Sequence, residues 1–333
     1  MRSVFTEPPP SFSQEEVYQI LKKSYHVIGE ITELYSDRDQ NFIISTDSEK
    51  YILKIFNCAE RESTLDLQLS AINYIVKNNP EVQVPKPIGE IVLAHKENNL
   101  FRICLFEYIR GSFLYEKKMG GDDYLKMGKF MGQFSKALSG FDHPGSQRIF
   151  EWDIQDYKLI YQRMKYIKSN QNQQTVHHFL NKFEDNVIPH LKNLRMSVIH
   201  NDGNDHNILV DEKGETTGII DFGDMVFSYQ ALEPAVCLAY IALDKKNPLP
   251  LMSFFLRGYQ SSFPLTNHEL QCLIYMTCVR LCLTVSMAAW RKTIFPDNKY
   301  LTISEPSAWS LLKKLEGENL NKWTEKLIHS ADS

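Results

Sequence analysis

The chain has 333 residues, of which 43% are hydrophobic and 23% are charged, and its formal net charge is -4. This composition is typical of a folded globular protein long enough for two cores, and it lacks the basic excess expected for binding nucleic acid or an anionic membrane. The start of the chain is not apolar like a signal peptide, and no run approaches the roughly 18 apolar residues of a membrane span. We therefore expect a cytoplasmic protein.

The first part of the chain predicts a small sheet accompanied by helices. Ser13-Gln14-Glu15-Glu16 is typical of a helix start. Three short runs rich in β-branched or aromatic residues follow, at 31–34, 41–45 and 51–56. Polar turns separate them, which favours an antiparallel arrangement of strands.

Lys54 lies in the third predicted strand, where alternation places it on one face with Ile52 and Phe56. A lysine within an apolar stripe requires an anionic partner. Its position matches the kinase lysine that grips the α and β phosphates of a nucleotide, although an edge-strand lysine that prevents aggregation is the alternative. In the helix expected from about residue 60, Gln68 is the first candidate partner for this lysine and Glu62 the second.

Two further segments of the first part are candidates for nucleotide contact. Residues 36–41 stand where a glycine-rich phosphate loop is expected but contain no glycine. Ser36 and Asn41 could still donate to phosphate, with a polar hairpin turn as the alternative. The run ending in Gly111 is typical of a connector, so we predict domains at 1–109 and 110–333. Backbone groups of Glu107, Tyr108 and Ile109 would then bond the purine edge of GTP or ATP.

The second part of the chain is predicted to be mainly helical, from the 3.6-residue spacing of its apolar residues. The expected helices include residues around 127–138, 157–168, 177–194, 231–243 and 268–292. Strand-like runs at 196–199 and 218–220 interrupt them.

Each of these strand-like runs leads into a motif that carries chemistry. The first motif is His200-Asn201-Asp202-Gly203-Asn204-Asp205-His206-Asn207, and the second is Asp221-Phe222-Gly223-Asp224. Phosphoryl transfer needs a carboxylate to orient the attacking hydroxyl and oxygen ligands for magnesium. The spacing assigns the first role to Asp202 and the Mg²⁺ ligands to Asn207 and Asp221. His200 is expected to brace the backbone.

These motifs resemble those of the aminoglycoside phosphotransferase and choline kinase superfamily. More narrowly, residues 39–42, 204–209, 221–225 and 295–299 are similar to the hydroxylysine kinases. The resemblance implies a bilobal, protein-kinase-like α+β fold with a small β-rich N-lobe and a larger, mainly helical C-lobe. It also implies Mg²⁺ dependence and transfer from GTP to the hydroxyl of an amino acid or amino alcohol. Asn201 and Gly203 depart from the superfamily pattern, which has glycine before the aspartate and a larger residue after it.

Acidic residues around the motifs predict an acceptor with a cationic amine. Asp205, Asp224 and Glu233 are the candidates, although Asp224 could join the metal, Asp205 could brace the loop and Glu233 could serve a helix start. Arg280 is the one arginine within the apolar segment Cys272 to Ala289. It could hold the carboxylate of an amino acid or form a buried ion pair within its own lobe.

Three functions remain open from the sequence. The first is a kinase for hydroxylysine or a close amino alcohol, with a small hydroxylated amine or amino acid and a nucleoside triphosphate as its partners. The second is the same chemistry on an aminoglycoside or choline-like acceptor. The third is a catalytically idle nucleotide-binding protein, which the residues at 201 and 203 suggest. The oligomeric state is open.

Overall fold

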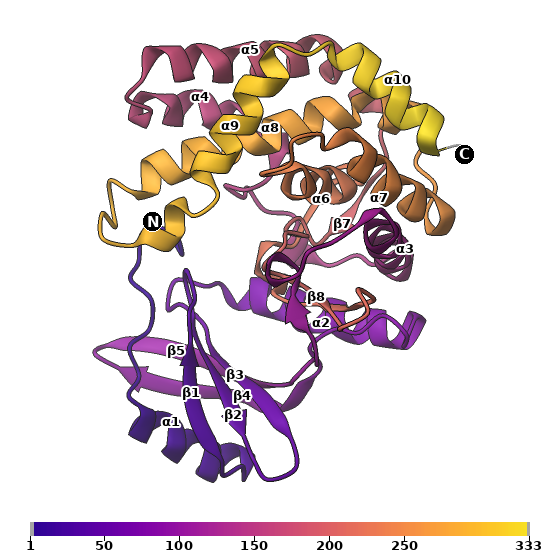
Figure 1. The fold of residues 1–333 in the computed structure, drawn as a ribbon. Helices are drawn as coiled ribbons and strands as arrows, with labels where there is room; N and C mark the ends of the chain where they lie inside the picture. Colours follow the sequence, from indigo (N-terminus) through magenta and orange to yellow (C-terminus); the bar gives the residue numbers. More distant parts are fainter. Residues whose placement is uncertain (1–2, 332–333) are drawn as a thin grey trace. The chain divides into compact units, whose positions relative to one another are not determined.

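The protein is represented by a computed structural model in which residues 3–331 are described, and the chain divides into two compact units (Figure 1). Unit 1 contains the described part of Met1–Asn73 together with Val84–Ile109. Unit 2 contains Tyr74–Gln83 and the described part of Arg110–Ser333. Residues 74–83 thus belong with unit 2, although they lie before the expected boundary between 109 and 110.

Unit 1 is built on one antiparallel sheet of five strands, in the order β1-β2-β3-β5-β4. The three strands expected near its start are confirmed as β1 to β3. The strands are β1 (Glu30–Leu34), β2 (Gln40–Ser45), β3 (Lys50–Ile55), β4 (Pro87–Lys96) and β5 (Asn99–Glu107). The helices are α1 (Gln14–Ile20), a π-helical turn (Leu21–Tyr25) and α2 (Glu62–Asn78), which begins in unit 1 and ends in unit 2.

One face of this sheet carries the core of unit 1. Phe42, Ile44, Leu53 and Ile103 point to that face and pack with Val17 of α1, which lies along the sheet in Figure 1. The expected start of α1 is confirmed: Ser13 accepts from the Glu16 N–H, and the Glu16 side chain accepts from the Ser13 N–H. Because this apolar face must be buried, the alternate residues of each strand lie on the opposite face of the sheet.

Unit 2 is mainly helical. Its helices are α3 (Gly121–Ala137), α4 (Lys158–Arg163), α5 (Asn170–Asn186), α6 (Leu232–Ala242), α7 (Leu249–Ser262), α8 (Asn267–Arg291), α9 (Glu305–Glu316) and α10 (Leu320–Ala331). Short 3₁₀ turns lie at Leu114–Glu116, Pro144–Ser146, Ile154–Asp156, Met164–Tyr166, Ile188–Asn193, Phe222–Asp224 and Lys299–Thr302. The helix expected at 177–194 begins earlier and ends at Asn186, because Pro189 lacks the N–H that would continue it.

A close crossing of two helices and one long buried helix organise unit 2. Helix α3 crosses α7 at glycines, since a Cβ on Gly128 would lie 1.9 Å from the Phe255 carbonyl oxygen and one on Gly258 would lie 1.9 Å from that of Leu125. Helix α8 is long and apolar enough to cross a membrane by length and composition, but 94% of its most apolar window is buried inside the protein. It is the central helix of the unit 2 core.

Two small antiparallel sheets complete unit 2 and position its loops. Strand β7 (Met196–Ile199) pairs with β10 (Val226–Tyr229), while β8 (Ile208–Val210) lies between β6 (Ser112–Phe113) and β9 (Thr216–Ile219). The strands expected before each motif are confirmed as β7 and β9. The motif at 200–207 therefore connects β7 to β8, and the motif at 221–224 connects β9 to β10.

Candidate active site

The loop 200–207 turns sharply at Asn201, which has a left-handed backbone with φ of 65°. Asparagine tolerates this conformation better than most residues because its short polar side chain can bond locally. Its amide nitrogen donates to the carbonyl oxygens of Trp152 at 3.3 Å and Asp224 at 3.4 Å. Asn201 thus replaces the glycine usual at this position and also ties the loop to two other segments.

Gly203, the second departure from the superfamily pattern, is explained by packing. A Cβ at this position would lie 2.7 Å from the Cys237 sulfur of α6 and 3.2 Å from the Met131 methyl of α3. The loop therefore passes too close to both helices for a side chain.

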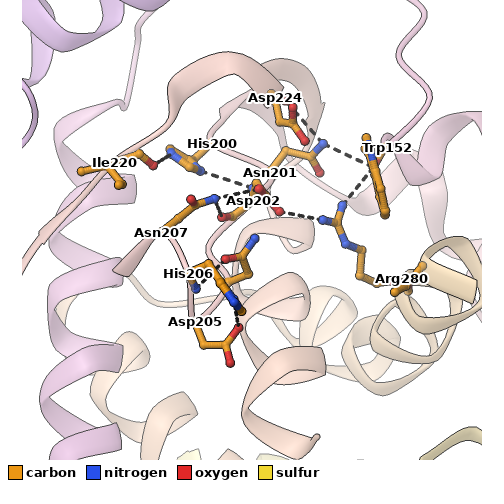
Figure 2. Close-up of polar contacts among 12 residues, drawn as sticks. Trp152, His200, Asn201, Asp202, Asp205, His206, Asn207, Ile220, Asp224 and Arg280 are labelled. Carbon is orange, nitrogen blue, oxygen red and sulfur yellow. Dashed lines mark hydrogen bonds and ion pairs between the residues drawn. The ribbon is translucent and has the colours of Figure 1, made fainter. Parts of the chain in front are cut away.

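Asp202 is held from two sides (Figure 2). The Asn207 amide donates to Asp202 Oδ2 at 2.7 Å and to the Asp202 carbonyl at 3.0 Å. On the other side, Arg280 Nη2 lies 2.9 Å from Asp202 Oδ1. The Asp202 side chain keeps 19% of its surface exposed.

The surroundings of Asp202 concentrate negative charge. Burial raises the pKa of the Asp202 carboxyl above its usual range, and the nearby carboxylates of Asp224 and Asp221 add to the rise. The positive charge of Arg280 opposes it. A carboxyl whose pKa lies closer to neutrality than usual is suited to accept a proton in general base catalysis.

His200 and Glu233 brace the loop from beneath. The His200 ring is fully buried, its Nε2 lies 3.1 Å from the Ile220 carbonyl oxygen, and its Nδ1 accepts from the Asp202 N–H at 3.3 Å. Burial lowers the pKa of His200 to about 4, so the ring is neutral near pH 7. His200 therefore joins the two motifs through backbone contacts, which agrees with the expectation from sequence.

Glu233 begins α6 and is 1% exposed. Its carboxylate accepts from the His200 N–H at 2.6 Å, and burial raises its pKa to about 7. The expected contact between Glu233 and the acceptor is therefore corrected. Glu233 is buried and braces the loop, which is the alternative suggested by its place at a helix start.

The expected metal ligands, Asn207 and Asp221, fit a divalent cation. Because the Asn207 Nδ2 is directed at Asp202, the amide oxygen is directed elsewhere and can coordinate. Asp221 stands in a left-handed turn directly after β9, with φ of 61° and its Oδ1 accepting from the Gly223 N–H at 3.4 Å. Among residues 3–331 no group of three or more His, Cys, Asp or Glu side chains could hold a metal ion. Asn207 and Asp221 supply only one carboxylate and one amide, so they fall outside that type of site.

A further side chain that stabilises the second motif was not found from sequence. Arg148 donates from Nη2 to the Gly223 carbonyl oxygen at 2.7 Å and to that of Met225 at 2.8 Å. It lies far from both motifs in the chain and carries no recognisable pattern, so only the folded arrangement reveals it.

A pocket of about 280 Å³ opens in unit 2 beside the loop 200–207. Gly203 and Asp205 of the loop line it, together with Tyr240 at the end of α6. Its charged lining includes acids and bases: Asp205, Asp244, Lys117 and Lys245. Asp205 also lies 3.1 Å from the His206 ring, which stacks on Tyr115 with 4.3 Å between ring centroids.

The positions of Arg280 and Asp224 differ from that of Asp205. Arg280 is 1% exposed and does not line the pocket. Its acidic partner in the same lobe is Asp202, the expected catalytic residue itself. Asp224 is 5% exposed and lies outside the pocket lining, close enough to influence the pKa of Asp202. Of the predicted substrate residues, only Asp205 faces the pocket.

In unit 1, Lys54 projects from the sheet face opposite the core, whereas Leu53 and Ile55 beside it in the strand face the core. The Lys54 Nζ lies 3.0 Å from Asp39 Oδ2. Asp39 lies in the predicted phosphate loop, and the sequence pattern does not indicate it as a partner of Lys54. Glu62, the second candidate, pairs instead with Arg102 at 3.1 Å. The buried Gln68 amide nitrogen has no hydrogen-bond partner in the described part of the chain.

The loop before β2 is anchored by Asn57. Asp39 Oδ1 accepts from the Asn57 N–H at 2.9 Å, and the Asn57 side chain donates to the Arg38 carbonyl at 3.0 Å. Asn41 is paired directly with Lys54 across β2 and β3, so both side chains share one face. Ser36 lies half-buried in the same loop.

The expected connector follows β5. The Glu107 N–H already donates to the Lys86 carbonyl oxygen at 2.8 Å. The Glu107 carboxylate lies 3.6 Å from Lys86 Nζ. Tyr108 and Ile109 then complete unit 1.

Comparison with known proteins identifies relatives over most of the chain. The sequence profile described as the phosphotransferase enzyme family, APH, matches residues 30–264. Hydroxylysine kinase of Mus musculus is 28% identical over 344 residues, which cover 94% of this chain and 90% of that protein.

Solved structures share the fold. Amicoumacin kinase in complex with AMP-PNP, Ca²⁺ and Ami has a TM-score of 0.69 at 16% identity, covering 91% of this chain and 93% of that one. A phosphotransferase in its GDP and kanamycin complex has a TM-score of 0.67 at 14% identity, covering 92% of this chain and all of that one. The fold class expected from sequence, a β-sheet N-terminal region followed by a helical C-terminal part, is confirmed.

Proposed function

The chain belongs to the phosphotransferase enzyme family, and from that premise we propose that it transfers the γ-phosphate of GTP or ATP to the hydroxyl of a small amino acid or amino alcohol, with 5-hydroxylysine as the leading acceptor. The mouse hydroxylysine kinase, similar over nearly the whole chain, supports this acceptor. The observation that carries the proposal is the pocket lined by Gly203, the residue after Asp202 in the chain, and by side chains of both signs of charge.

In the proposed reaction, the acceptor oxygen forms a bond to the γ-phosphorus. The bond from that phosphorus to the oxygen bridging the β-phosphate breaks, and its electron pair leaves with the nucleoside diphosphate. The proton of the acceptor hydroxyl passes to the Asp202 carboxylate. Asp202 orients the hydroxyl before transfer, because proton loss is late when the transition state is loose.

The nucleotide is assigned to the sheet face of Lys54 and to the connector. Lys54 would bind the α and β phosphates, with Ser36 and Asn41 as further donors in or beside the loop. The purine edge is assigned to the backbone of Tyr108 and Ile109, since the Glu107 N–H is already engaged. The neutral Gln68 lies buried on α2 and would be a second contact of Lys54.

Asn207 and Asp221 would hold Mg²⁺ through an amide and a carboxylate oxygen. When bound, the cation offsets the negative charge of the nucleotide phosphates. One solved neighbour contains AMP-PNP with Ca²⁺ and another contains GDP, so both nucleotide bases should be tested as donors.

The acceptor is assigned to the pocket of about 280 Å³. Asp205 and Asp244 suit the ammonium groups of the acceptor, and Lys117 and Lys245 suit its carboxylate. The volume lies near the lower end of the roughly 300–1,000 Å³ usual for ligand sites, which favours a single amino acid over a multi-ring aminoglycoside. A choline-like acceptor would have no carboxylate for the two lysines.

The test is release of GDP or ADP that depends on the acceptor, measured with GTP and with ATP. The panel is 5-hydroxylysine, its decarboxylated form 1,5-diaminopentan-2-ol, 1-amino-2-propanol, choline and kanamycin. We expect 5-hydroxylysine to give the highest kcat/KM, by about tenfold or more over the decarboxylated form, because two lysines would lose their partner. Higher kcat/KM for choline or kanamycin, or nucleotide binding with no acceptor-dependent release, contradicts the proposal.

A further inference from the structure

Arg280 is a fully buried charge whose position requires an explanation. It lies in the middle of α8, with Val279 and Leu281 beside it, and is 1% exposed. Burying a guanidinium without partners costs several kcal/mol, so an arginine persists at such a site only where specific acceptors receive it.

The groups that contact the Arg280 guanidinium come from three segments that are distant in sequence. Nη2 donates to Asp202 Oδ1 at 2.9 Å, and Nη1 donates to the Trp152 carbonyl oxygen at 3.2 Å. The guanidinium carbon also lies 4.8 Å from the centroid of the Trp152 ring and 6.0 Å from that of Tyr240. The contacts with Trp152 and Tyr240 therefore orient the plane of the guanidinium independently of its bond to Asp202.

Asp202 is correspondingly fixed at both oxygens. In Figure 2 Arg280 approaches the carboxylate from one side and Asn207 from the other. Oδ1 accepts from Arg280 Nη2, and Oδ2 accepts from the Asn207 amide. A carboxylate with one donor at each oxygen cannot rotate without losing a bond, yet each oxygen keeps a further lone pair for an acceptor hydroxyl.

We propose that Arg280 is a positioning residue for phosphoryl transfer: it holds the Asp202 carboxylate in the orientation that receives the acceptor hydroxyl, and it does not bind the acceptor's own carboxylate. This inference rests on the proposed function, in which Asp202 receives the hydroxyl proton. Misplacing a reacting group by about 1 Å can cost roughly 100-fold in rate, so loss of Arg280 should act on kcat.

The alternative role, binding of the substrate carboxylate, conflicts with two observations. Arg280 does not line the pocket, whereas Lys117 and Lys245 do. The Arg280 side chain is also 1% exposed, so the surrounding groups shield its donors from a ligand that enters from solvent. The position of Arg280 is already determined by groups of the protein.

The test compares Arg280→Met and Arg280→Lys with a matched control, Arg291→Met. Arg291 is a second buried arginine of α8, 4% exposed, and lies eleven residues further along the helix. Turnover is measured as GDP release with 5-hydroxylysine and GTP, and thermal unfolding shows that each variant is folded. Methionine fills much of the arginine volume, and lysine keeps the charge but cannot donate along the two directions of the guanidinium.

We expect Arg280→Met to lower kcat by about 100-fold and Arg280→Lys by about tenfold, with KM for both substrates within about threefold of the wild type. Added methylguanidinium should restore part of the kcat of Arg280→Met by occupying the vacated space. The Arg291→Met control should keep the wild-type kcat. If Arg280→Met does not fold, the lysine variant decides the question.

Two results would overturn the inference. One is a folded Arg280 variant with wild-type kcat, which would mean that Asp202 needs no arginine. The other is an unchanged kcat with a raised KM for 5-hydroxylysine but not for 1,5-diaminopentan-2-ol, which would assign Arg280 to the substrate carboxylate. Both results require an active wild type, so they are distinct from failure of the proposed function, in which the wild type itself shows no acceptor-dependent release.

Discussion

Unit 1 holds its lysine through a partner 15 positions away, whereas unit 2 holds Asp202 through an arginine 78 positions away. The Lys54–Asp39 pair joins a strand to the loop that precedes its neighbour, and strand register alone nearly determines it. The Asp202–Arg280 pair exists only when α8 packs under the catalytic loop. Changes in unit 1 should therefore act locally on nucleotide binding, while changes in unit 2 should affect both catalysis and folding stability.

The largest effect is expected for Asp202→Asn. The amide keeps the shape of the side chain but cannot accept the hydroxyl proton as a carboxylate does, so kcat should fall by about 1,000-fold. Nucleotide affinity, measured by calorimetry, should stay within about threefold because Asp202 is not assigned to the nucleotide. An Asp202→Asn variant with wild-type kcat would show that Asp202 is not the base. It would also contradict the assignment of catalysis to unit 2.

A pH-dependent effect on stability is expected for Glu233→Gln. The pKa of Glu233 rises from 4.5 to about 7 on folding, so the folded protein keeps a proton that the unfolded chain releases within this window. The stability that this group contributes is greatest below pH 4.5 and is lost as the pH rises through 7. Above pH 7 the buried charge costs about 3 kcal/mol, which glutamine avoids while keeping an acceptor for the His200 N–H.

Urea unfolding at about pH 5 and about pH 8 measures this prediction. The glutamine variant should gain stability relative to the wild type at the higher pH and differ less at the lower one. An equal difference at both values would show that Glu233 does not change its protonation in this range.

A smaller loss is expected for Gly203→Ala. The added Cβ would lie 2.7 Å from the Cys237 sulfur, so the loop or α6 must shift, at a cost of about 1–3 kcal/mol. The double variant Gly203→Ala/Cys237→Ala removes the sulfur and should recover much of the melting temperature. If the double variant is no more stable than the single one, contact with Cys237 does not explain the glycine.

The smallest effect is expected for Glu62→Gln in unit 1. The Glu62 side chain is 84% exposed in its pair with Arg102, and exposed ion pairs contribute at most about 1 kcal/mol. The KM for GTP should not change, whereas Asp39→Asn should raise it because Lys54 would lose its partner. Steady-state kinetics of the two variants side by side measures the difference. A larger effect of Glu62→Gln would restore Glu62 as the working partner of Lys54.

The sequence was informative where geometry depends on neighbours in the chain. Alternation placed Lys54 on one face of its strand with Ile52, and the two motifs were expected on loops after strands, as found. The left-handed backbone of Asn201 is compatible with its residue type, because asparagine tolerates this conformation.

Contacts between distant segments could not be derived in this way. Asp39 was overlooked because kinases are expected to use a helical acid, and Arg148 and Asp244 carry no local pattern. The partner of Arg280 depends on the packing of α8, which periodicity does not reveal. Sequence reasoning could therefore state that this arginine needs an acid, but not that the acid is Asp202.

The Trp152 carbonyl oxygen accepts hydrogen bonds from the side chains of both Asn201 and Arg280. Because this acceptor belongs to the main chain, alanine scanning would leave it in place and would undervalue the segment. Insertions or deletions between Arg148 and Asp153 should be far less tolerated than side-chain replacements, since they would move the oxygen. Efforts to alter this enzyme should keep the length of that segment fixed while varying its side chains.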